Sequence, residues 1–142
     1  MELEKRILST NDAGLIAILY EALIDNFNKS IKVIEEKEFE KLNEITNHSR
    51  DILTELMVQF GGKDQVSKYI TEISLYLNRL ITEGEYEKNP FIYKNCIKIA
   101  TPILEAFKEL EIKSDPKTVA GLTYGKNTLD EYSFQNNKTF EG

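Results

Sequence analysis

Hydrophobic residues recur along the first part of the chain at the spacing of an α-helix. Between residues 15 and 60, where there is neither glycine nor proline, they fall mainly three or four positions apart. The first stripe consists of Leu15, Leu19, Leu23, Phe27, Ile31 and Ile34. Such spacing keeps side chains on one face of a helix, whereas a half-buried strand would alternate every second residue. Ser9 and Asp12 resemble a capping box, so the pattern predicts a helix that begins near Thr10.

Two more helices follow in the pattern. The polar residues 35–38 interrupt the first stripe, and a second stripe then extends over residues 39–60. Gly61 and Gly62 favour the left-handed conformation that ends many helices, and Asp64 is a suitable cap for a third helix. The stripe of this third helix consists of Val66, Ile70, Ile73, Leu77 and Leu80.

A fourth helix is predicted after Asn89 and Pro90, which offer a capping residue and a proline at the first helical position. Gly84 is expected in the joint before this helix. The fourth stripe consists of Ile92, Cys96, either Ile99 or Ala100, Ile103, Phe107 and Leu110. Pro102 lies within the stripe and removes one backbone hydrogen bond, so we expect a kink or a break near Ile99.

Four helices joined by short loops predict the fold class, which is all-α: an antiparallel up-down four-helix bundle with a mostly irregular C-terminal tail. We expect the bundle to occupy residues 1–112. Residues 113–142 are rich in threonine, asparagine and glycine, a composition typical of a tail.

The composition argues against several classes of function. Among 142 residues, 18 are Lys or Arg and 24 are Asp or Glu, so the net charge is −6, which disfavours binding to nucleic acid. The sequence predicts neither a signal peptide nor a membrane-spanning stretch, so we expect no membrane insertion and a cytoplasmic location. Because the charges of the tail cancel, the bundle carries the net negative charge.

Candidates for chemistry are few. Cys96 is the one cysteine of the sequence and His48 is the one histidine, so the chain is unsuited to an internal disulfide or a Cys/His metal site. A di-metal bundle needs Glu-x-x-His pairs, whereas Glu44 and His48 are one position further apart. Cys96 falls on an apolar stripe, where a thiol packs as a small hydrophobic group. We therefore expect no enzyme activity, no cofactor and no metal, and a partly exposed His48.

The apolar faces are wider than one bundle seam needs, which is about three positions in seven. The additional apolar residues of the first helix are Ile16, Ile18, Tyr20, Ala22 and Ile24. Tyrosines also stand beside the main stripes at Tyr20, Tyr69, Tyr76 and Tyr93. A tyrosine combines a large apolar ring with a polar tip, which favours half-exposed positions at recognition surfaces. This excess of apolar surface predicts a protein that binds amphipathic helices.

The order of these residues resembles a known family. Residues 9–23, STNDAGLIAILYEAL, resemble the opening helix of the flagellar secretion chaperone FliS, with its Leu-x-x-x-Leu-Tyr-acidic-small pattern after a Ser/Thr cap. Residues 38–44, EFEKLNE, look like the start of the family's second helix, and residues 75–81, LYLNRLI, look like its third. The resemblance covers roughly residues 9–111. Its motif positions are occupied by Leu15, Leu19, Tyr20, Ala22, Tyr76, Asn78, Arg79 and Leu80.

The resemblance implies a function. FliS-like proteins bind the C-terminal helical segment of flagellin in the cytosol, keep it from polymerising before export, and help to deliver it to the flagellar type III export apparatus. The implied partners are therefore flagellin and the export apparatus, and we expect a monomer or a weak dimer. From the excess of amphipathic surface, we predict client contacts at Ile16, Tyr20, Ile24, Met57, Tyr69 and Tyr76.

Alternatives stay open at this point. Wide apolar faces also suit a structural bundle that associates with copies of itself, or an adaptor for a different amphipathic helix. The tail contains apolar residues at Val119, Leu122, Tyr124, Leu129, Tyr132, Phe134 and Phe140. Either part of it docks on the bundle when no client is present, or it is a flexible terminus.

Overall fold

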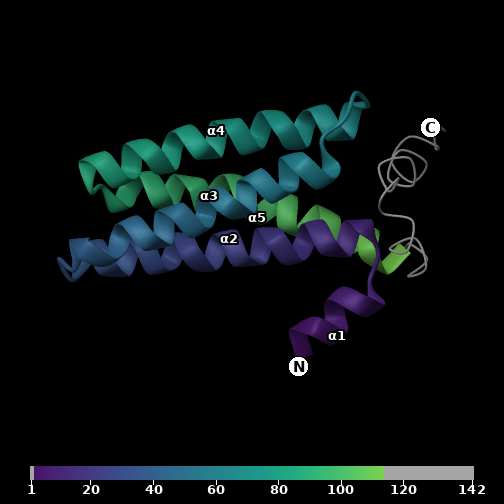
Figure 1. Ribbon diagram of the computed structural model, residues 1–142, viewed down its shortest axis with the longest axis horizontal. Coiled ribbons are helices and arrows are strands. Elements are labelled where there is room, and N and C mark those ends of the chain that lie inside the picture. The colour runs from purple at the N-terminus through teal and green to yellow at the C-terminus, as the bar shows by residue number, and fades with distance from the viewer. Residues whose placement is uncertain (1, 114–142) are drawn as a thin grey trace.

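The computed structural model describes residues 2–113, which form a bundle of four long helices with a short helix at its N-terminal end (Figure 1). The long helices are α2 (Asp12–Glu35), α3 (Leu42–Phe60), α4 (Gln65–Glu87) and α5 (Pro90–Lys113). The short helix α1 (Glu2–Ser9) precedes them, and a 3-10 turn, η1 (Phe39–Lys41), leads into α3. The predicted all-α four-helix bundle is confirmed. Lys113, the first residue of the predicted tail, is the last residue of α5, and the rest of the predicted tail lies outside the described residues.

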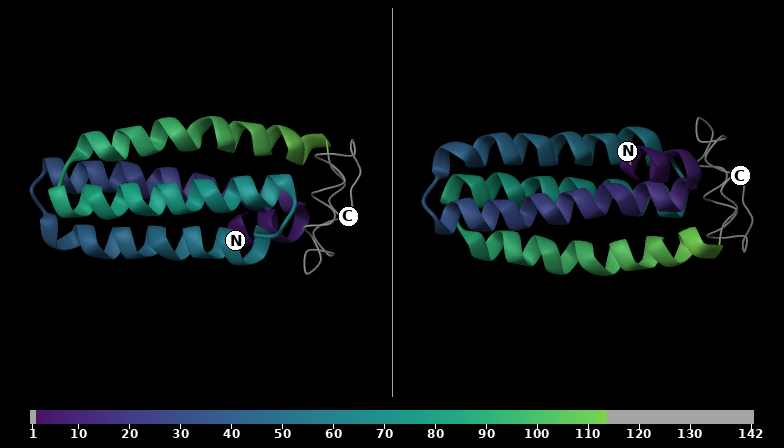
Figure 2. Two further views of the ribbon diagram at one scale, coloured as in Figure 1. Left: turned by 90° about the horizontal axis from the view of Figure 1, so that it is seen from above. Right: turned by 90° about the horizontal axis from the view of Figure 1, so that it is seen from below.

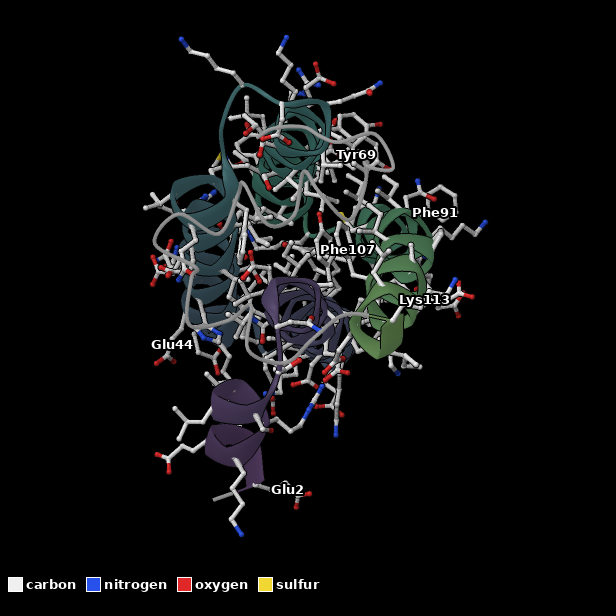
Figure 3. All side chains as sticks on the ribbon, turned by 90° about the vertical axis from the view of Figure 1, so that its right-hand side faces the viewer. Glu2, Glu44, Tyr69, Phe91, Phe107 and Lys113 are labelled. Carbon is white, nitrogen blue, oxygen red and sulfur yellow. The ribbon has the colours of Figure 1, made fainter. Side chains whose placement is uncertain are left out.

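The four long helices surround a single core. Seen end-on, α2, α3, α4 and α5 occupy the corners of a square, and Phe107 points into the middle (Figure 3). Each helix packs on two neighbours: α2 on α3 and α5, and α4 on α3 and α5. Of these four pairs, α2 and α5 make the most extensive contact and α4 and α5 the least extensive. The bundle therefore has one tight seam and one seam that is less closed.

Large side chains from all four helices fill the core. The largest of those that are fully buried are Tyr20, Tyr93, Phe27, Phe60, Ile16, Leu23, Leu42, Leu53, Leu56, Ile70, Leu77 and Ile81. Each such side chain stabilises the fold by roughly 1.5–3 kcal/mol relative to exposure to water. The buried residues of α2 and α5 also include Ala13, Ala17 and Ala100, whose small size permits the close contact between these two helices.

The start of α2 differs from the prediction because of contacts with the C-terminal end of α5. Asn11, not Ser9, caps α2, and its side-chain oxygen accepts a hydrogen bond from the Gly14 amide at 2.9 Å. The Asn11 amide donates to the backbone carbonyl of Glu111 at 3.0 Å, and the Thr10 hydroxyl donates to the Glu111 carboxylate. These contacts separate α2 from a preceding helix, α1, that was not predicted.

Other helix ends follow the sequence signals in part. Asp64 caps α4 by accepting from the Ser67 amide at 2.9 Å, and Asn89 accepts from the Phe91 amide at 2.9 Å, as predicted. Gly61 is extended, with φ −75° and ψ 139°, so the predicted left-handed end of α3 is absent there. Lys37 and Lys88 are the non-glycine residues with positive φ in the described part of the chain.

Two helix breakers lie inside helices. Gly84, expected in a joint, is buried within α4, and a Cβ atom built there would lie 2.8 Å from the Tyr93 ring. Glycine is therefore needed where Tyr93 approaches the backbone of α4. Pro102 does not break α5, which is continuous from Pro90 to Lys113 (Figure 2). Of the kink or break predicted near Ile99, the break is absent, because packing on two neighbouring helices offsets the lost hydrogen bond.

Asp12, the first residue of α2, is a buried acid. Its side chain is almost inaccessible to water, and neither carboxylate oxygen has a hydrogen-bond partner within residues 2–113. Burial disfavours the charged form and raises the pKa of the Asp12 carboxyl to about 7. Near neutral pH the protonated and charged forms of Asp12 therefore coexist in the folded protein.

Gly84→Ala should destabilise the protein by roughly 1–3 kcal/mol, because the added methyl group would overlap the Tyr93 ring. This loss should exceed the gain of about 1 kcal/mol that alanine brings to a helix interior. Urea unfolding followed by circular dichroism measures the change, with the neighbouring exposed residue replaced in Glu83→Ala as a control. An unchanged or higher stability of Gly84→Ala would show that α4 and α5 are further apart than described.

Asp12→Asn should remove part of the pH dependence of stability. Unfolding exposes Asp12 and returns its pKa to an ordinary value, so its contribution is complete below about pH 4 and is lost as the pH rises to about 7. The free energy of unfolding of Asp12→Asn should therefore be higher than that of the wild type by roughly 1–3 kcal/mol at about pH 8. At about pH 4 the two values should differ little. Parallel pH profiles of unfolding free energy for the two proteins would contradict the assignment.

Candidate functional site

The six residues predicted to contact a client do not form one surface. Ile16 and Tyr20 are fully buried in the core, so their side chains are not available at the surface of this conformation. Ile24 on α2 and Met57 on α3 are half-buried. Tyr69 and Tyr76 on α4 are exposed by 48% and 42%. The expectation of half-exposed tyrosines also fails for Tyr93, which is buried.

Tyr69 and Tyr76 belong to an apolar row on one flank of α4. With Ile73 and Leu80 they occupy positions i, i+4, i+7 and i+11, which lie along one side of a helix. Ile73 and Leu80 are partly buried and pack against the core. The row is therefore continuous from the edge of the core to the solvent.

Side-chain contacts identify the neighbouring helix on each flank of α4. On one flank, Arg50 of α3 donates to the Thr82 hydroxyl at 2.9 Å, and Asn43 of α3 donates to the Glu85 carboxylate at 2.9 Å. On the other flank, Gly84 lies against Ile92 and Tyr93 of α5. The helical period places the tyrosine row on this second flank, along the seam between α4 and α5.

Residues of α5 complete this surface. Ile92 and Ile99 are two helical turns apart, are partly exposed, and belong to the side of α5 that contacts Gly84. We call the surface formed by Tyr69, Ile73, Tyr76, Leu80, Ile92 and Ile99 the α4–α5 face. Figure 3 shows Tyr69 on the side of the bundle where α4 and α5 meet. Because this seam is the least extensive of the four, its apolar side chains remain partly exposed.

The α4–α5 face has a polar margin on α4. The Arg79 guanidinium carbon lies 5.4 Å from the centre of the Tyr76 ring, a cation–π arrangement that holds the ring in place. Glu72 and Glu83 are exposed on the same helix. An apolar row beside charged residues is the arrangement expected of a surface that binds one side of an amphipathic helix.

The core also contains a polar group of α2, the hydroxyl of Tyr20. The Tyr20 side chain is fully buried, and its hydroxyl has no hydrogen-bond partner within residues 2–113. Burial raises the pKa of the Tyr20 phenol, and the electrostatic effect of Tyr69 raises this pKa further.

The described residues offer little for catalysis or metal binding. No group of three or more His, Cys, Asp or Glu residues between positions 2 and 113 is arranged to hold a metal ion. Cys96 is buried, as its place on the stripe predicted, and burial raises the pKa of its thiol to about 12. His48 is exposed, and its Nδ1 lies 2.9 Å from the Asn26 amide nitrogen. Each helix of this region is too short or too polar to cross a bilayer.

Comparison with known families gives the context of this fold. A family model described as flagellar protein FliS matches residues 2–114. The chain belongs to the FliS family. The match extends over all five α-helices, whereas the sequence resemblance began only at residue 9. No curated protein matches the chain. Family membership supports a flagellar export chaperone role and places the chain in a family of chaperones rather than enzymes.

The sequence predicted part of the α4–α5 face of this FliS-family protein. It selected Tyr69 and Tyr76, but it assigned Ile73, Leu80, Ile92 and Ile99 to the core stripes. A signal was present, because Tyr69 and Tyr76 share one helical row with Ile73 and Leu80. Which flank of α4 stays open was not visible, since that depends on the positions of α3 and α5.

Alanine substitutions should separate the buried tyrosine from the exposed one. Tyr20→Ala should lower the free energy of unfolding by about 3–5 kcal/mol, because it leaves a large cavity in the core. Tyr76→Ala should cost less, about 1 kcal/mol, because Tyr76 is 42% exposed and its ring also faces the exposed Arg79 side chain. Denaturant unfolding measures the free energy of unfolding of both variants. Similar decreases for the two would contradict the burial of Tyr20 and the exposure of Tyr76.

Proposed function

We propose that this FliS-family protein binds the C-terminal helical segment of flagellin in the cytoplasm. Binding would prevent premature polymerisation, and the protein would assist delivery of flagellin to the flagellar type III export apparatus. The observation that carries this proposal is the α4–α5 face, an apolar surface that the bundle leaves partly open, in a chain that belongs to the FliS family.

The chemistry of the face suits a helical client. Tyr69 and Tyr76 offer large apolar surfaces that lose little conformational entropy on binding, and Ile73 and Leu80 extend the same row. A segment that is disordered when free gains helix by placing its apolar side on such a surface. Competition for that side of the client would prevent it from pairing with other flagellin molecules.

The size of such an interface favours contacts beyond one face. Segments that fold on binding usually bury on the order of 1,000–3,000 Å², which is more than six partly buried side chains provide. Ile24 on α2 and Met57 on α3 are half-buried apolar residues elsewhere on the bundle. An extended client that wraps more than one seam would reach them, so both remain in the proposed set of contacts with Tyr69 and Tyr76.

Titration of the full chain with a peptide from the C-terminus of flagellin tests the proposal. Calorimetry should detect binding, and circular dichroism should show more helix in the mixture than in the separate components. Tyr76→Ala should weaken binding by about 10-fold, the effect of losing roughly 1.4 kcal/mol at a contact. Tyr86→Ala is the matched control, because Tyr86 is also on α4 but is 85% exposed and outside the α4–α5 face.

Two results would contradict the proposal. Absence of binding, or binding with no gain of helix, would remove flagellin as the client. Equal decreases in peptide affinity for Tyr76→Ala and Tyr86→Ala would show that the α4–α5 face is not the binding site. Sedimentation of the chain without peptide addresses self-association, since a stable oligomer that dissociates in Tyr76→Ala would indicate that a second copy covers the face.

A further inference from the structure

Charged residues around Gly84 are separated by sign between α4 and α5. Residues 80–87 of α4, LITEGEYE, contain three glutamates and neither lysine nor arginine. Residues 91–100 of α5, FIYKNCIKIA, contain two lysines and no acidic residue. These two stretches pack on each other, because Gly84 lies against Ile92 and Tyr93. At this end, the α4–α5 face therefore lies between an acidic stretch of one helix and a basic stretch of the other.

Two of the glutamates border the apolar row of α4. Glu83 follows Leu80 by three positions and Tyr76 by seven, and Glu87 follows Leu80 by seven, so both lie beside that row. Both are exposed. Glu85 differs, because its carboxylate accepts a hydrogen bond from α3 on the opposite flank. We call Glu83 and Glu87 the acidic edge of the face.

A pair of lysines stands on the other helix. Lys94 and Lys98 are exposed on the turns of α5 that contain Ile92 and Ile99, and we call them the basic edge. The ion pairs found within residues 2–113 involve other side chains. In this part of the chain, the charges of both edges are therefore not neutralised by direct pairing.

These charges are not placed where they would stabilise the free bundle. Like charges four positions apart on a helix repel each other, and both edges have this spacing. Glu87 is also the last residue of α4, where the helix dipole disfavours a negative charge. A partner with the opposite charges would relieve both costs. The arrangement therefore suits recognition of a partner better than stability of the fold.

We propose that this end of the α4–α5 face selects an amphipathic client helix by charge: Lys or Arg on one side of its apolar surface meets the acidic edge, and Asp or Glu on the other side meets the basic edge. The inference rests on the function proposed above and names the kind of helix that the face accepts. It also fixes the direction of the client. When a helix is reversed along the seam its two sides change places, and like charges would then oppose each other.

Neutral variants of the acidic edge test this inference in the full chain. At low salt, Glu83→Gln/Glu87→Gln should weaken binding of the flagellin C-terminal peptide by about 5–10-fold. Calorimetry at about 1 M salt should show a much smaller difference, because salt screens exposed charges. Urea unfolding should show that the variant is at least as stable as the wild type, because the repulsion between the two glutamates is removed.

The matched control is Glu40→Gln/Glu44→Gln. It changes the net charge by the same amount, and both residues are exposed at the start of α3. Figure 3 shows Glu44 on the side of the bundle away from α5. The control should bind the peptide like the wild type. An equal loss of affinity in the control would mean that only the overall charge matters, which would overturn the inference.

Peptide variants identify the charges that meet each edge. One Lys→Gln or Arg→Gln replacement in the peptide should weaken binding to the wild type but have no effect on binding to Glu83→Gln/Glu87→Gln. Likewise, one Asp→Asn or Glu→Gln replacement should lose its effect in Lys94→Gln/Lys98→Gln. The two coupled peptide residues should lie on opposite sides of the apolar surface of the peptide helix. Coupled residues on the same side would contradict the inference.

The remaining outcomes separate this inference from the function on which it rests. If Glu83→Gln/Glu87→Gln binds the peptide like the wild type at low salt, the inference fails while the proposed function stands. If that variant also unfolds more easily than the wild type, the acidic edge serves to hold α4 on α5 instead. If the wild type does not bind the peptide, the proposed function fails and the inference fails with it.

Discussion

The close packing of α2 on α5 is the contact on which the rest of the bundle depends. Small buried residues, Ala13, Ala17 and Ala100, permit the approach of the two helices, and the hydrogen bonds of Thr10 and Asn11 to Glu111 join their ends. A helix of the bundle has one apolar stripe to share between two neighbours. Since α5 makes its most extensive contact with α2, it makes a less extensive one with α4. The partly open α4–α5 face follows from this unequal division.

The unequal contacts of α5 with α2 and α4 also explain the composition of the α4–α5 face. On its other flank, α4 is joined to α3 by polar contacts such as those of Arg50 with Thr82 and Asn43 with Glu85. On the side of α5, four apolar residues of α4, Tyr69, Ile73, Tyr76 and Leu80, form one row that is partly exposed. In a chain with a net charge of −6, an apolar face bordered by charged residues remains compatible with solubility when no partner is bound. A chaperone needs this balance, because its binding surface is exposed for part of its working cycle.

Some helix ends were predicted correctly from local residue types, whereas tertiary contacts decided others. Asp64 and Asn89 cap helices as their residue types predict, because capping depends on atoms only two or three residues away. Gly84 looks like a joint in the sequence, yet it lies inside α4 because the Tyr93 ring needs the space that a side chain would take. The separation of α1 from α2 depends on Glu111, which is about 100 residues away, so no local pattern could show it.

The sequence by itself determined the fold class and the four amphipathic helices, because helical periodicity identifies amphipathic segments. On α2 the buried side differs from the predicted stripe: Leu15 and Leu19 are partly exposed, whereas Ile16, predicted as a surface contact, is fully buried. The sequence also carried the motifs that resemble the FliS family. Only the tertiary structure decided which apolar residues remain at the surface. Tyr20 and Tyr76 are both tyrosines beside apolar stripes, yet one is enclosed by the core and the other borders the solvent. The difference arises because exposure depends on where neighbouring helices lie, and those positions are set by packing across the whole bundle.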